Sequence, residues 1–151
     1  MHYTSVDHIG FVVSSLDRSI PFYTRLLGVE PDLRLLWEGE EYVGRIVGYP
    51  EVKIEGAFFK LPGGGVLELL QYHHPVPGTV DMETYNTGNA HLGLASEDIR
   101  ADVARLRGHI ELRNPEPVEI PSGPAKGGFA IYARDPDGIT IELIQKPPGQ
   151  S

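Results

Sequence analysis

The stretch that decides the fold is Pro136–Gln145, PDGITIELIQ, because the chain carries the same pattern earlier as Pro62–Gln71, PGGGVLELLQ. In both stretches a proline and a glycine lead into an apolar run that contains one glutamate, Glu68 or Glu142, six positions after the proline. A Pro/Gly turn followed by such a run is typical of a β-hairpin. Each copy therefore predicts a strand that carries a glutamate and folds back on the strand before it.

The repetition extends outward to the beginning of each half. His8-Ile9-Gly10 opens one apolar run and His91-Leu92-Gly93 opens the other. A predicted helix follows each run: the first is preceded by Ser14-Ser15 as a cap, and both end at a glycine. The apolar residues of these helices recur at helical spacing: Leu16, Ile20, Tyr23 and Leu27 before Gly28, and Ile99, Val103 and Leu106 before Gly108.

Two further strands complete each half. The partners of the glutamate strands are predicted at Ala57–Leu61 and Phe129–Ala133, and less regular strands near Tyr42–Val47 and Val118–Ile120. Each half is then a βαβββ module, and the fold class is α+β.

Residues 1–151 are expected to form a single domain of two modules, 5–72 and 89–146. A Pro- and Gly-containing polar loop, 73–88, joins the modules. The paired modules are predicted to form a cupped, open mixed sheet.

Alternation along the strands places the polar residues of both modules on equivalent faces. In the first strand Ile9 and Phe11 should pack under the helix, which leaves His8 on the opposite face. The same counting applies to the other three strands. It predicts that the face away from the helices carries His8, Glu68, His91 and Glu142.

If the two half-sheets curve toward each other, these imidazoles and carboxylates converge in one cavity. The sequence has no cysteine, so a metal must be held by His and carboxylate side chains, which suit Zn, Ni, Co, Fe or Mn. A single strand histidine or glutamate is usually structural, but matched positions in both halves favour a metal site. Four ligands leave an octahedral ion two positions for water or substrate, which implies catalysis.

The motifs HIGFVVSSLDRSIPFYTRLLG, LELLQY, HLGL and DPDGITIEL resemble the vicinal oxygen chelate superfamily over His8 to Gln145. This superfamily includes glyoxalase I, methylmalonyl-CoA epimerase, extradiol dioxygenases, fosfomycin-resistance enzymes and bleomycin-binding proteins. The resemblance implies paired βαβββ modules around a divalent metal, commonly within a homodimer.

The complete set of four ligands favours a metal-dependent isomerase or lyase acting on a small, metal-chelating substrate by carboxylate-mediated proton transfer. Glu68 and Glu142 are the candidates for metal ligand and base, with Glu51 or Glu55 as an upstream alternative base. The alternatives are an Fe(II) extradiol-type dioxygenase, which would leave Glu68 without a ligand role, and a non-catalytic drug-binding module. The substrate stays open, including whether it is a glutathione or CoA conjugate.

Other polar residues carry weaker signals. His73 and His74 are expected in the exposed loop. Five residues could line the cavity but are more typical of sheet and surface positions: Tyr42, Tyr72, Tyr132, Arg45 and Arg134.

Composition limits the possible partners. The formal charge of −8 and the absence of a Lys/Arg run argue against a nucleic-acid surface. No signal-like segment or membrane-length apolar stretch stands out, so a cytoplasmic protein is expected.

Overall fold

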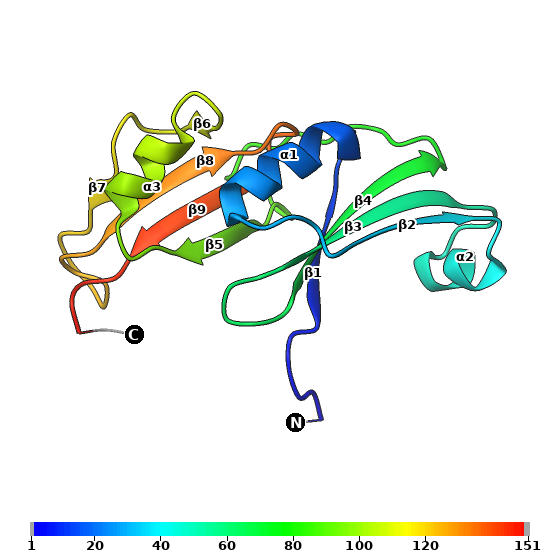
Figure 1. Ribbon diagram of the computed structural model, residues 1–151, viewed down its shortest axis with the longest axis horizontal. Helices are drawn as coiled ribbons and strands as arrows, with labels where there is room; N and C mark the ends of the chain where they lie inside the picture. The colour runs from blue at the N-terminus through cyan, green and yellow to red at the C-terminus, as the bar shows by residue number, and fades with distance from the viewer. Residues whose placement is uncertain (1, 150–151) are drawn as a thin grey trace. The chain divides into compact units, whose positions relative to one another are not determined.

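The computed structural model describes residues 2–149, which form two compact units: unit 1 ends at Thr79 and unit 2 begins at Val80. Unit 1 contains β1 (His8–Val12), α1 (Leu16–Leu27), β2 (Leu33–Glu38), α2 (Glu41–Val47), β3 (Lys53–Lys60) and β4 (Val66–His74) (Figure 1). Unit 2 contains β5 (His91–Ala95), α3 (Ile99–Leu106), β6 (Glu111–Leu112), β7 (Val118–Glu119), β8 (Phe129–Arg134) and β9 (Thr140–Gln145). The predicted α+β class is confirmed.

The two sheets repeat one topology. In unit 1 the strand order is β1-β4-β3-β2, and in unit 2 it is β5-β9-β8-β6, with β7 also pairing β8. The first strand of each unit runs parallel to the glutamate strand, with Gly10 opposite Glu68 and Gly93 opposite Glu142. The repeated sequence pattern therefore corresponds to a repeated register.

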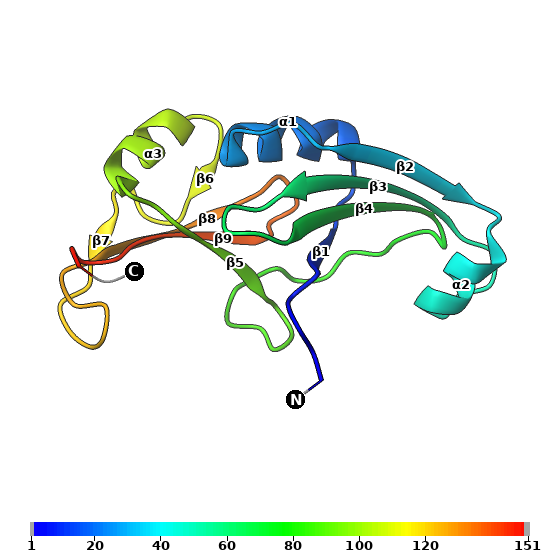
Figure 2. The same cartoon turned by 60° about the horizontal axis from the view of Figure 1, so that its bottom comes forward.

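Each sheet packs one face against a helix. In unit 1, α1 covers the sheet (Figure 2) and buries Leu16 and Tyr23 on the side where Leu67 and Leu69 are fully buried. In unit 2, Ile99 and the other apolar residues of α3 are buried together with the alternate residues of β8 and β9: Ile131, Ala133, Ile141 and Leu143. Since successive strand residues point to opposite faces, the glutamates between these apolar residues lie away from α1 and α3.

The glutamine at the end of each repeated sequence motif forms a hydrogen bond with the first residue of the helix that packs on the same sheet. Gln71 Oε1 accepts a hydrogen bond from the backbone N–H of Leu16 (2.7 Å), and Gln145 Oε1 accepts one from Ile99 (2.9 Å). Ser15 occupies the N-cap position of α1 but makes no side-chain capping bond. A serine thus occupies the predicted cap position, but a glutamine from a distant strand, and not the serine side chain, accepts the hydrogen bond at the helix terminus.

The strand predicted near Tyr42–Val47 is also wrong, because these residues form α2 and the corresponding strand is β2. Val43 and Val47 recur at helical spacing and pack in one apolar cluster with Ile54. The strand near Val118–Ile120 is present as the short β7, accompanied by an additional strand, β6. The loop expected to begin at residue 73 begins later, because β4 continues through His74. Within residues 2–149 no helix has the length and apolar character needed to cross a membrane.

Candidate functional site

Unit 1 places a histidine and a glutamate side by side on the sheet face opposite α1. His8 Nε2 lies 3.7 Å from Glu68 Oε2, and their side chains are 51% and 18% exposed. Gly10 is the register partner of Glu68, and a Cβ added to it would stand 3.4 Å from Glu68 Oε2. A glycine at this position leaves space around the carboxylate.

A third residue orients the imidazole of this pair. His8 Nδ1 lies 2.7 Å from Asp7 Oδ1, and this hydrogen bond is the main cause that raises the pKa of His8, with a further contribution from the charge of Glu68. A carboxylate on one ring nitrogen is the usual way in which proteins orient a metal-binding histidine. The other nitrogen, Nε2, is the one that faces Glu68.

Unit 2 contains the equivalent pair. His91 Nε2 lies 3.1 Å from Glu142 Oε2, with side-chain exposures of 42% and 21%. Tyr132, opposite Glu142 on β8, has its hydroxyl 3.5 Å from His91 Nε2, and the two rings are 5.2 Å apart. Burial, and then the charge of Glu142, raise the pKa of Tyr132.

The spacing of the donor atoms in each pair can be compared with that of neighbouring ligands around one divalent ion. With metal–ligand bonds of about 2.1 Å, adjacent donors of an octahedral ion stand about 3 Å apart. The unit 2 pair, at 3.1 Å, has this spacing, and the unit 1 pair, at 3.7 Å, is wider. Neither unit alone brings three metal-ligating side chains together among the described residues. The structure thus joins the four predicted ligands in pairs, and their convergence on one ion stays a prediction.

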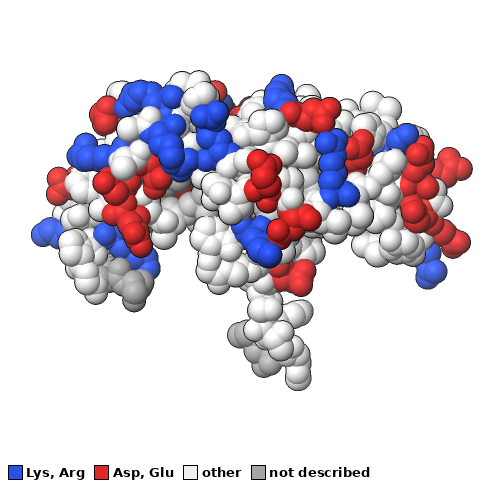
Figure 3. Space-filling view, in the orientation of Figure 1, with Lys and Arg blue, Asp and Glu red and all other residues white. Residues whose placement is uncertain are grey.

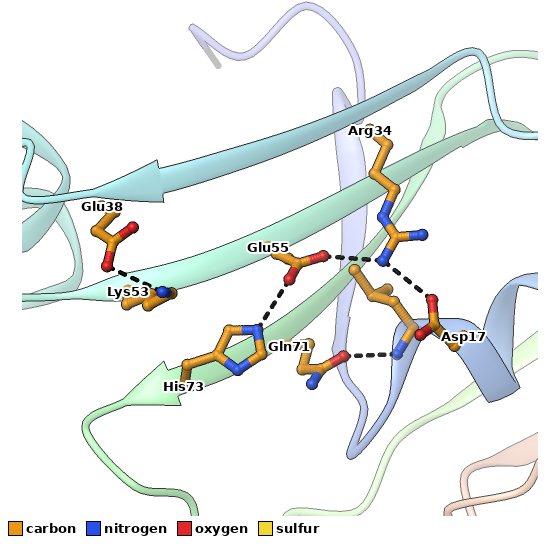
Figure 4. Close-up of polar contacts among 8 residues, drawn as sticks. Asp17, Arg34, Glu38, Lys53, Glu55, Gln71 and His73 are labelled. Atoms are coloured by element: carbon orange, nitrogen blue, oxygen red, sulfur yellow. Dashed lines mark hydrogen bonds and ion pairs between the residues drawn. The ribbon is translucent and has the colours of Figure 1, made fainter.

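A separate polar network lies on the α1 face of unit 1 (Figure 4). Arg34 Nη2 contacts Asp17 Oδ1 (3.1 Å) and Glu55 Oε2 (2.9 Å), and Glu55 Oε1 contacts His73 Nε2 (3.1 Å). The hydrogen bond from Arg34 is the largest cause that lowers the pKa of Glu55.

Neither Glu51 nor Glu55, the alternative bases suggested by the sequence, lies where it could serve the pair formed by His8 and Glu68. Glu55 shares the α1 face with Ala57, so it points away from Glu68. Glu51 lies in the turn before β3, in a left-handed conformation with φ 51°. His73 and His74 are exposed as expected, but both belong to the end of β4 and not to the loop.

The weaker candidates lie in different places. Arg45 lines a cavity of about 910 Å³ beside α2, where acidic side chains gather on the face seen in Figure 3. Tyr72 packs against the apolar cluster under α2. Arg134 shares the face of Glu142 in unit 2 and forms an ion pair with Glu83.

Sequence reasoning missed Asp7 and the acidic partner of Arg134. Asp7 could have been found from its position beside a candidate ligand, because metal-binding histidines commonly hydrogen-bond a carboxylate. No sequence pattern pointed to Glu83, because its pairing with Arg134 depends on how the loop between β4 and β5 packs.

With this geometry established, comparison with known proteins identifies the family. Residues 5–143 match the profile of the Glyoxalase/Bleomycin resistance protein/Dioxygenase superfamily, so the chain belongs to this superfamily. A glyoxalase family protein from Bacillus cereus has a similar structure, with a TM-score of 0.75 and 27% identity over 97% of this chain and 98% of that one.

Several curated relatives have enzyme names. The chain is 34% identical to a probable lactoylglutathione lyase of Vibrio cholerae over 91% of this chain and 88% of the relative. It is 32% identical to a lactoylglutathione lyase of Arabidopsis thaliana, covering 93% of this chain but 44% of the plant protein. A 2-epi-5-epi-valiolone epimerase from Actinomyces is 26% identical over 96% of this chain and 81% of the relative. The chain thus spans less than half the length of its plant relatives.

Proposed function

We propose that this protein is a metal-dependent lyase or isomerase of the glyoxalase/epimerase type. In this proposal it moves a proton next to a carbonyl group of a small oxygenated substrate. The observation that carries the proposal is the matched pairing of one imidazole and one carboxylate in each unit, at 3.7 Å and 3.1 Å. The names of the lactoylglutathione lyase and epimerase relatives support the reaction class.

The metal would be held by His8, Glu68, His91 and Glu142. Nitrogen and oxygen donors of this kind suit Zn, Ni, Co, Fe or Mn. When bound, a divalent ion would polarise the carbonyl oxygen of the substrate as a Lewis acid. Asp7 would hold His8 in the tautomer that leaves Nε2 unprotonated and directed toward Glu68.

The proton transfer would be performed by a carboxylate. Glu68 and Glu142 are 18% and 21% exposed, so each is shielded from bulk water yet accessible from the sheet surface. A carboxylate beside the substrate can remove a proton next to the carbonyl and return it to the same or the neighbouring carbon. We assign the two glutamates as the ligand and the base of this reaction.

A metal ion bound by all four proposed ligands would take two of them from each unit. We also propose that the protein is a cytoplasmic homodimer. Association would also bury apolar side chains that are exposed on the chain: Val12, Leu33, Leu35 and Leu36 are 38–55% exposed. Sedimentation at micromolar concentration should give twice the 16.6 kDa mass of the chain. A species of 16.6 kDa alone would count against the dimer.

The metal site is tested by elemental analysis of the purified protein and of two variants. His8→Ala and His91→Ala should each lose most of the bound metal while circular dichroism stays unchanged, because the strands do not depend on the imidazoles. His109→Ala, which removes an exposed histidine next to α3, is the matched control and should keep its metal. Full metal occupancy in both site variants would refute the proposed ligand set.

A further inference from the structure

The loop between β4 and β5 places a carboxylate between two arginines of unit 2. Glu83 Oε1 lies 2.8 Å from Arg134 Nη2, and Glu83 Oε2 lies 3.3 Å from Arg113 Nη2. Arg134 belongs to β8 and is 15% exposed, whereas Arg113 and Glu83 are 39% and 34% exposed. One carboxylate therefore faces two guanidinium groups at the surface of the unit.

Hydrogen bonds within the loop fix its shape, and Met82 packs it against the β8–β9 turn of unit 2. Glu83 N–H donates to Asp81 Oδ1 (2.9 Å), and the Asn89 side-chain amide donates to the carbonyls of Asp81 (3.0 Å) and Glu83 (2.8 Å). Met82 packs over the β8–β9 turn, where a Cβ added to Gly138 would lie 3.2 Å from Met82 Cβ. The Glu83 carboxylate can therefore leave the arginines without releasing the loop.

Glu83 neutralises the charge of Arg134 but does not satisfy all of its hydrogen-bond donors. Among the described residues, Arg134 Nε and Nη2 are buried without a partner in hydrogen-bonding geometry, although Nη2 is close to Glu83. Buried donors are normally paired, and a guanidinium fork is best satisfied by a carboxylate that accepts two parallel hydrogen bonds. The carboxylate of a free ligand can approach the guanidinium in this bidentate geometry, whereas the Glu83 carboxylate is tethered to the backbone of the loop.

These arginines lie beside the proposed metal-binding pair of unit 2. Thr140 is the register partner of both His91 and Arg134, so His91 and Arg134 stand on the same face, two strands apart. With about 4.8 Å between neighbouring strands, their Cα atoms are about 10 Å apart. A small molecule can span this distance with its carbonyl near Glu142 and an anionic group at Arg134.

The charges around Arg134 favour a ligand with a single negative charge. The carboxylates of Asp81 and Glu111 also act on this guanidinium, in addition to Glu83. Once a ligand carboxylate has replaced Glu83, the two arginines are matched by the carboxylates of Asp81 and Glu111, so a second negative charge on the ligand, as on a phosphate dianion, would be repelled.

We propose that Arg113 and Arg134 form a carboxylate-binding subsite that Glu83 occupies in the absence of ligand. A carboxylate of the substrate displaces Glu83 and takes both arginines. The identification of this ligand as the substrate rests on the proposed function, whereas carboxylate binding itself does not.

The subsite is tested with propionate, which has one carboxylate and no second oxygen group that would chelate a metal. The protein is titrated with propionate, and the arginine Nε–Hε resonances are followed by NMR. Glu83→Gln should bind propionate about 10-fold more tightly than the wild type, because the internal competitor is removed. Glu116→Gln, which removes the partner of Arg107 at 2.9 Å elsewhere in unit 2, is the matched control and should behave as the wild type.

Adding Arg134→Met, or separately Arg113→Met, to Glu83→Gln should weaken binding again, and propionamide should not bind. Arg113 is the more exposed arginine, so its variant tests the subsite even if Arg134→Met fails to fold. The proposal is overturned if Glu83→Gln binds no more tightly than the wild type, or if Glu83→Gln/Arg113→Met binds as Glu83→Gln does. Preferential binding of inorganic phosphate would overturn the carboxylate assignment. A protein that binds propionate in this way but shows no metal or proton transfer would retain the subsite and lose the proposed function.

Discussion

Replacing Glu68 by glutamine separates its role as a metal ligand from its role as a base. The amide keeps an oxygen at the position 3.7 Å from His8 Nε2 but has almost no affinity for a proton. Three ligands of the proposed set are unchanged, so most of the metal should stay bound. Proton transfer should fall about 10²- to 10⁴-fold, the usual contribution of a positioned general base, which corresponds to about 3–5 kcal/mol in the barrier.

The assay is deuterium exchange from solvent into three candidate substrates, measured together with metal content. The candidates are 2-hydroxyacyl compounds, 2-oxoaldehyde hemithioacetals and 2-methyl-branched thioesters. Glu55→Gln is the matched control, because Glu55 lies on the α1 face of the same sheet and should not affect exchange.

The outcomes distinguish the possible roles. If Glu68→Gln loses its metal outright, Glu68 is a structural ligand and Glu142 must be the base. If the wild type exchanges none of the candidates but contains iron and consumes dioxygen with a catechol, the isomerase proposal is wrong and a dioxygenase replaces it. A stable metal-free protein that binds an aromatic ligand tightly would instead indicate a binding module.

Three further predictions concern the residues around the site. Asp7→Asn should weaken metal binding about 10- to 100-fold, because it removes a carboxylate that orients a histidine ligand. Titration against a chromophoric chelator measures the metal affinity, and an unchanged affinity would contradict the orienting role of Asp7. Gln71→Ala should lower the free energy of unfolding by about 1 kcal/mol, because the Leu16 N–H loses its capping acceptor, and an unchanged urea midpoint would exclude the cap. Arg34 lowers the pKa of Glu55 in the folded protein. The ionised Glu55 therefore stabilises the fold at a pH above the pKa that Glu55 has in the unfolded chain, and this stabilisation is lost as the pH falls through the lowered pKa of the folded protein. The difference in melting temperature between wild type and Glu55→Gln should shrink on acidification.

The face that carries the four candidate ligands could be predicted from the sequence because strand geometry is strict. A side chain on a strand has two possible directions, so an apolar residue on each side of Glu68 and Glu142 determines which way the glutamates point. The parallel pairing then places His8 and His91 near them, with Gly10 and Gly93 at equivalent register positions. This parallel pairing joins strands that are distant along the chain, and the repeated pattern did not predict it.

The incorrect predictions concern short elements whose conformation depends on tertiary packing. Tyr42–Val47 contains β-branched residues that suit a strand, but Val43 and Val47 form a helix that packs against Ile54. The helix terminus at Leu16 is satisfied by Gln71, 55 positions away, rather than by the adjacent serine. Local propensity is a weak guide where a contact from a distant strand decides the outcome.

The repeat also conceals a difference between the halves that bears on the two glutamates. Phe58 lies opposite Glu68, whereas Tyr132 lies opposite Glu142 and brings a hydroxyl within 3.5 Å of His91. The unit 2 pair is therefore closer, at 3.1 Å, and has a neighbouring hydroxyl, while the unit 1 pair is separated by 3.7 Å beside an apolar ring. A ligand that must leave the ion to act as a base is better served by the looser arrangement. We therefore favour Glu68 as the base and Glu142 as the permanent ligand, which means that Glu142→Gln should lose more metal than Glu68→Gln.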